Sequence, residues 1–63
     1  MLDINIDPYI LLSIVNTKLR NVYSTLDVFI EETSIDKSLL LKKLQSIGYK
    51  YNSVTNQFVS DEA

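Results

Sequence analysis

Hydrophobic residues recur with a helical spacing over three segments of this 63-residue chain, 8–21, 25–33 and 37–47. The first segment begins at Asp7 and Pro8, an N-cap residue followed by a proline that sacrifices no helical hydrogen bond at this position. The apolar side chains of this segment cover a wide face of the helix, and a face of this width predicts packing against more than one neighbour. We expect a second subunit to be one of these neighbours. The apolar side chains on this face are Ile10, Leu11, Leu12, Ile14, Val15, Leu19 and Val22.

The second and third segments begin at residues that commonly cap helices. Ser24, with Asp27 three residues later, is a variant of the capping box, and Asp36 is the expected N-cap of the third helix. Gly48 stands where a left-handed residue commonly ends a helix. Because the connection near residues 33–35 is short, the two helices are predicted to form a helix-turn-helix. The third helix should pack through Leu40, Leu44 and Ile47.

The period of hydrophobicity changes to two at both ends of the chain. Residues 49–59 alternate around a polar run and predict a β-hairpin, with a tail over 60–63. Residues 1–7 also alternate, which is typical either of a short strand beside the hairpin or of an N-terminal arm. The predicted fold class is mainly α: a single domain, 1–63, with three helices arranged as in a helix-turn-helix and a C-terminal β-hairpin as a small wing.

The composition excludes several kinds of catalytic and metal-binding site. The chain contains no cysteine and no histidine, which excludes zinc sites of the usual Cys/His kind, thiol catalysis and any imidazole base. The carboxylates stand mainly at expected helix starts and in the tail, where capping and solubility explain them. We therefore expect a protein that is not an enzyme, with no catalytic residues, no metal site and no cofactor.

Neither an export signal nor a membrane segment is visible in the sequence. The N-terminal residues Met1, Leu2 and Asp3 include no basic side chain, and the longest clean apolar run is Tyr9–Leu12. Such a run is far shorter than a bilayer requires. We expect a cytoplasmic protein with no membrane partner.

The first functional hypothesis is binding to a second copy of the same chain. A domain this small, without disulfides or a metal, commonly gains stability by self-association, and the wide face of residues 8–21 would supply the interface. The protein would then be a non-enzymatic homodimeric protein-interaction or adaptor module with a protein partner of unknown identity. The candidate dimer face consists of Ile10, Leu11, Ile14 and Val15.

Charge is segregated along the chain, and this supports an alternative function. Residues 1–36 hold six acidic and two basic side chains, whereas residues 37–60 hold four lysines and no acidic side chain. Because lysines on one face neutralise phosphates, the alternative is a small helix-turn-helix regulator that binds DNA or RNA through the third helix and the hairpin. The competing interpretation is an ordinary solvated helix face, since no arginine lies in this region. The candidate binding face consists of Lys37, Ser38, Lys42, Gln45 and Lys50.

Two strings that lie far apart in the chain carry a resemblance to a known family. They are Leu11-Leu12-Ser13-Ile14-Val15-Asn16 and Ile47-Gly48-Tyr49. Over about residues 7–58 the chain resembles domain-of-unknown-function family 4250, a family of short bacterial proteins. The resemblance implies a bacterial source and brings no activity, cofactor or binding residue. More loosely, the stretch from the third helix into the hairpin is similar to the ends of phage and plasmid helix-turn-helix domains. Aligning Ile35 with the buried apolar position of their turn puts Ser34 where glycine is usual and Ile30 where alanine is usual.

Overall fold

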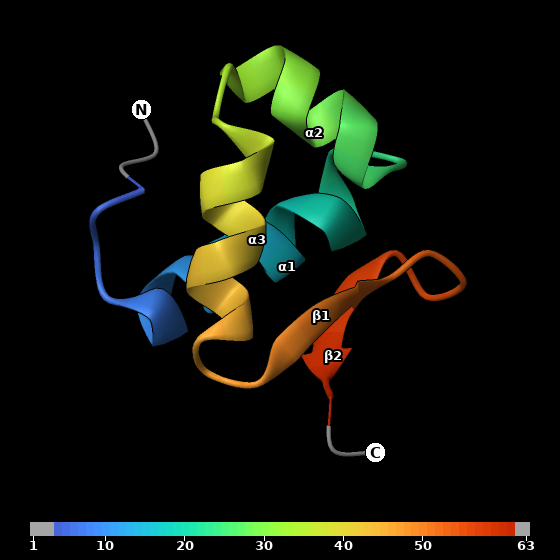
Figure 1. Cartoon of the computed structure of the whole chain (residues 1–63). Coiled ribbons are helices and arrows are strands. Elements are labelled where there is room, and N and C mark those ends of the chain that lie inside the picture. Colours follow the sequence, from blue (N-terminus) through green and yellow to red (C-terminus); the bar gives the residue numbers. More distant parts are fainter. Residues whose placement is uncertain (1–3, 62–63) are drawn as a thin grey trace.

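Three helices are followed by a two-stranded antiparallel hairpin in the computed structural model, which describes residues 4–61 (Figure 1). The predicted fold class, a mainly helical domain with a C-terminal hairpin, is confirmed. The elements are α1 (Pro8–Asn21), α2 (Leu26–Thr33), α3 (Lys37–Gln45), β1 (Tyr49–Asn52) and β2 (Gln57–Ser60).

Side-chain caps start all three helices. The Asp7 carboxylate accepts a hydrogen bond from the Tyr9 amide at 2.8 Å, and the Asp36 carboxylate caps α3 in the same manner. The prediction of Ser24 as the cap of α2 was wrong by one residue. Thr25 is extended, with φ −147°, and its hydroxyl accepts from the Val28 amide at 3.2 Å, so the helix begins after Thr25.

Two left-handed residues mark the ends of α2 and of the turn that follows α3. Ser34 has φ 58° and closes the turn between α2 and α3, at the position where the helix-turn-helix comparison expects glycine. The third helix ends at Gln45, two residues before the predicted end at Ile47. Gly48, with φ +82°, then redirects the chain into β1.

The core is a single cluster to which every helix and β2 contribute. From α1 come Leu11, Val15 and Leu19, all buried, because this helix contacts α2, α3 and β2 together. Neighbours within the same chain therefore cover most of the wide apolar face of α1. Val22 is 60% exposed, since α1 ends at Asn21 and the chain turns away. The other core residues are Leu26, Phe29, Leu40, Leu44 and Phe58.

The two ends of the chain differ from the sequence-based prediction. Residues 4–7 form a turn and not a strand, and the predicted strand over residues 1–3 lies outside the described residues. Ile4 and Ile6 still pack partly against the core. Ser60 belongs to β2 and not to the predicted tail, because β2 pairs with β1 as far as the Tyr49–Ser60 pair. Within residues 4–61, no helix is long and apolar enough to span a membrane.

Candidate interaction surface

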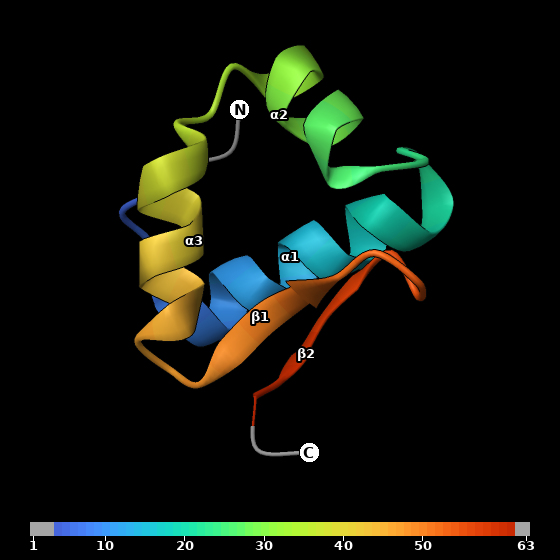
Figure 2. The same ribbon diagram turned by 45° about the vertical axis from the view of Figure 1, so that its right-hand side comes forward.

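The side chain of Asn16 on α1 binds the backbone of β2 as a neighbouring strand would. Its amide nitrogen donates to the Phe58 carbonyl at 3.0 Å, and its amide oxygen accepts from the Phe58 N–H at 2.7 Å. The Gln57 amide adds a donated bond to the Asn16 carbonyl at 3.0 Å. These bonds close the outer edge of β2 at Phe58 and fix the hairpin against α1, which runs behind α3 and the hairpin in Figure 2.

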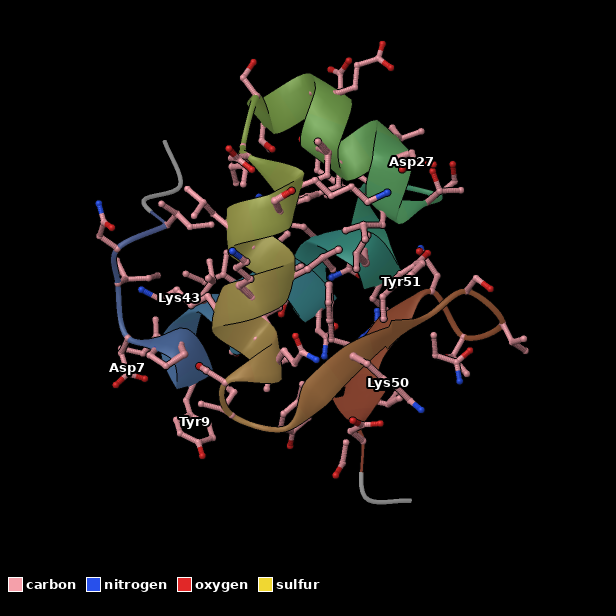
Figure 3. The ribbon with its side chains drawn as sticks, viewed as in Figure 1. Asp7, Tyr9, Asp27, Lys43, Lys50 and Tyr51 are labelled. Atoms are coloured by element: carbon pink, nitrogen blue, oxygen red, sulfur yellow. The ribbon has the colours of Figure 1, made fainter. Side chains whose placement is uncertain are left out.

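Asn56 and Tyr51 fix the other end of the hairpin to the loop between α1 and α2. Asn56 adopts φ 54°, and its amide nitrogen donates to the carbonyls of Leu19 and Tyr23 at 2.9 and 3.0 Å. The Tyr51 hydroxyl donates to the Asn56 amide oxygen at 2.6 Å and accepts from the Leu26 amide at 3.3 Å. The Tyr51 side chain therefore lies between the hairpin and the start of α2 (Figure 3).

Two hollows flank this connection. The first, of about 540 Å³, lies between the end of α1 and the hairpin turn, beside Arg20 and Asn56. The second, of about 430 Å³, lies between the start of α2, α3 and β1. We name the second hollow the α2–α3–β1 groove. Its apolar lining comes from Leu26, Leu41 and Tyr51, and its rim carries Asp27, Lys37 and Ser53.

All five residues of the candidate nucleic-acid face are exposed, and they lie on α3 and β1. Two of the lysines, however, have carboxylate partners: Lys37 lies 3.0 Å from Asp27, and Lys50 lies 3.1 Å from Asp61. In the described part of the chain, Lys42 takes part in no salt bridge. Lys37 lines the α2–α3–β1 groove, whereas Lys42 lines a separate hollow beside Ile4 and Asn5. The fold therefore spreads the candidate residues over more than one side of α3 and β1; they are Lys37, Ser38, Lys42, Gln45 and Lys50.

The candidate dimer face is divided by the fold. Leu11 and Val15 are 0% exposed and belong to the core, so their assignment to a dimer face was wrong. They point inward because α1 packs on α2, α3 and β2 at once. Ile14 is half-buried, and Ile10 is 56% exposed. Beside Ile10, Tyr9 is also exposed at the start of α1 (Figure 3).

Carboxylates do not gather into a site among residues 4–61. No group of three or more acidic side chains in this range is placed to hold a metal ion. Asp7 and Asp36 instead cap helices, and Asp27 and Asp61 pair with lysines. The surface therefore offers hydrogen bonds, apolar contact and lysine charge.

The family model described as a domain of unknown function (DUF4250) matches residues 5–58. The chain belongs to this family. Both strings that carry the resemblance lie within the matched residues. The first string belongs to α1 and the second leads into the hairpin, and hydrogen bonds between Asn16 and Phe58 join these two elements. No curated protein and no solved structure matches the chain.

Sequence reasoning did not assign Asn16, Tyr51 or Asn56 to a site, although all three lie within the matched residues and Asn16 ends the first string of the resemblance. Asn16 lies 42 residues from Phe58, and a period of hydrophobicity gives no information about such a pairing. Leu41 is not among the residues through which the third helix was predicted to pack, and its contribution to a groove required the hairpin to be in place. The available signal was a polar residue next to a buried one, since Asn16 follows Val15 in the first string.

Proposed function

We propose that the protein is a non-enzymatic protein-interaction module that binds its partner in the α2–α3–β1 groove. The observation that carries the proposal is the groove itself, an open hollow of about 430 Å³ at which three elements place the apolar side chains Leu26, Leu41 and Tyr51. A concave surface with an apolar floor and a few polar groups at the rim is typical of recognition sites.

The rim of the groove supplies charge of both signs. Lys37 and Asp27 form an exposed ion pair, and a pair of this kind contributes little to folding stability. Either group can therefore turn to a charged group of a partner at small cost. Partner side chains would enter the apolar floor while the rim sets orientation.

Nucleic-acid binding ranks second. The alternative was motivated by four lysines without nearby acid in the sequence, yet Lys37 and Lys50 each lie close to a carboxylate, at 3.0 and 3.1 Å. Each paired carboxylate opposes a phosphate and reduces the counterion release on which affinity depends. Asp36, the N-cap of α3, places a further negative charge at the N-terminal end of the helix that would contact the nucleic acid.

A capture experiment tests the proposal. Wild-type protein, Leu41→Glu and Val54→Glu would be immobilised and exposed to a lysate of the organism that encodes the protein, with nuclease present. Val54 is 92% exposed at the hairpin tip and lies outside the groove, so it is the matched control. We expect partners that wild type and Val54→Glu retain and that Leu41→Glu loses by about tenfold or more, since a charge buried against an apolar floor is costly.

Equal capture by all three folded variants would contradict the proposal. Labelled duplex and single-stranded pools provide the second arm. Binding that falls steeply with salt and is lost in Lys42→Glu would favour the nucleic-acid alternative instead. Circular dichroism of each variant verifies that the helices are retained.

A further inference from the structure

The two outer edges of the hairpin differ in their hydrogen bonds to the rest of the domain. Phe58 directs its N–H and C=O away from β1, because both groups bind the Asn16 side chain on α1. Phe58 and its partner Tyr51 therefore form a pair without mutual hydrogen bonds. By the same alternation Tyr49, paired with Ser60, also directs its backbone groups away from β2.

The outer edge of β1 consequently presents two N–H and two C=O groups, from Tyr49 and Tyr51. Among residues 4–61, no hydrogen bond from another element reaches these four groups. The outer edge of β2, by contrast, is closed at Phe58. An unpaired edge is a template on which another chain can add as a strand.

We infer that an extended segment of the partner protein adds to β1 as a third strand, along the edge at which the α2–α3–β1 groove lies. This inference rests on the proposed function and names the form in which the partner binds. Tyr51 and Ser53 line the groove, so a segment on the β1 edge places one side against Leu41. Main-chain hydrogen bonds then supply affinity, and alternate side chains supply specificity.

The side chains on the sheet define the chemistry of the segment. Tyr51 faces the core and packs on Phe58, with ring centres 5.5 Å apart, whereas Lys50 projects into solvent on the opposite face (Figure 3). Lys50 lies 3.1 Å from Asp61 in an exposed pair that contributes little to stability, so an acidic residue opposite Lys50 on the added strand can replace Asp61 as its partner. The neighbours of this acidic residue on either side face the groove and pair best when they are apolar. The segment therefore alternates apolar and acidic side chains.

A second copy of β1 fits this edge less well. An antiparallel pairing that uses both Tyr49 and Tyr51 of each copy centres on Lys50, so that two lysines lie directly opposite each other. Like charges in this position are destabilising. An acidic residue opposite Lys50 avoids this repulsion, which favours an acidic segment over a copy of the chain.

Selection from a phage-displayed library of short linear peptides tests the inference on the intact protein. The strongest binders would be synthesised and their backbone nitrogens methylated one at a time. In a strand added to β1, alternate N–H groups face β1. We expect methylation to weaken binding about tenfold or more at alternate positions and to have little effect between them. Binders should alternate apolar and acidic residues.

Two variants of one residue test the same edge from the protein side. Tyr49→Pro removes the outward N–H, and Tyr49→Ala removes the same ring while keeping that N–H. Proline is tolerated here because the lost N–H makes no bond to β2. We expect Tyr49→Pro to bind the selected peptides about tenfold more weakly than Tyr49→Ala. In wild type, the amides of Tyr49 and Tyr51 should exchange more slowly with deuterium when peptide is bound.

Several results would overturn the inference. They are a library without binders, uniform effects of methylation along the peptide, or equal binding by folded Tyr49→Pro and Tyr49→Ala. Leu41→Glu separates the two proposals. If this variant loses peptide binding while methylation shows no alternation, the groove function stands and strand addition fails. If methylation alternates and Leu41→Glu binds normally, strand addition stands and the groove function fails.

Discussion

Left-handed backbone conformations occur at three described residues, and each has a different chemical basis. Gly48 has φ +82°, and a Cβ at this position would meet no atom within 4 Å, so only backbone conformation favours glycine there. Ser34, with φ 58°, occupies a helix C-cap. Asn56, with φ 54°, belongs to the residue type that tolerates this region best after glycine, and its side chain also binds two carbonyls. Asn56 therefore combines a turn with an anchor.

Substitutions of Asn56 separate these two contributions. Asn56→Gly loses the bonds to Leu19 and Tyr23 but keeps the backbone conformation, and we expect it to lower the free energy of unfolding by about 1–3 kcal/mol. Asn56→Ala loses the same bonds and adds a left-handed alanine, which costs about 1 kcal/mol more. Urea unfolding followed by circular dichroism measures both. Equal free energies of unfolding for the two variants would show that the left-handed backbone at residue 56 is no less favourable for alanine than for glycine.

At the level of elements, short helices and short strands are fixed by contacts with one another. Over the residues that the structure describes, the sheet has two strands, β1 and β2, which are too few for independent stability in water. Asn16 on α1 supplies two hydrogen bonds to Phe58, and Phe58 in turn contributes its buried ring to the core. The hairpin is therefore stable only as part of the helical domain.

Asn16→Ala tests how α1 holds the hairpin. The variant leaves the N–H and C=O of Phe58 without their partner, and we expect a loss of about 1–3 kcal/mol in the free energy of unfolding. The Phe58 amide should also exchange faster with deuterium than in wild type. Thr17→Ala is the control, because the exposed Thr17 hydroxyl bonds only to the Ser13 carbonyl of the same helix. We expect that control to change stability by less than about 0.5 kcal/mol. A control as unstable as Asn16→Ala would contradict the anchoring role.

At the scale of the whole molecule, the apolar face of α1 is explained by one core, which comprises eight buried side chains among residues 4–61. The motive for a homodimer was the width of that face, and α2, α3 and β2 cover most of it. Tyr9 and Ile10 stay exposed at its outer end. The prediction of a homodimer through Ile10 and Ile14 stays untested and now concerns a smaller surface.

Ile10 and Leu11 distinguish a dimer face from a core. Leu11→Ala should lower the free energy of unfolding by about 2–5 kcal/mol, because it opens a cavity in the core. Ile10→Asp should change stability by less than about 1 kcal/mol if the folded unit is the single chain. Chemical unfolding over a dilution series checks both. A wild-type midpoint that rises with protein concentration, together with loss of that dependence in Ile10→Asp, would establish the homodimer.

Local physical chemistry allowed the sequence by itself to determine most of the elements of this protein. Asp7, Pro8 and Asp36 mark helix starts because their effects act within one turn, and Gly48 marks a change of direction because of its own φ. The periods of hydrophobicity gave the class of each segment and most of its length. Ser24 was mistaken for the cap because Ser24 and Thr25 are chemically equivalent candidates, and only the backbone conformation distinguishes them.

Tertiary structure alone decided which apolar and polar residues meet. A periodic pattern places Leu11 and Ile10 near the same face of a helix, but the positions of α2, α3 and β2 decide that one is buried and the other exposed. Likewise, Asn16 reaches Phe58 and Asp27 reaches Lys37 only after the helices have packed. The groove and the open edge of β1 arise from these long-range contacts, which depend on spatial arrangement and leave no period in the sequence.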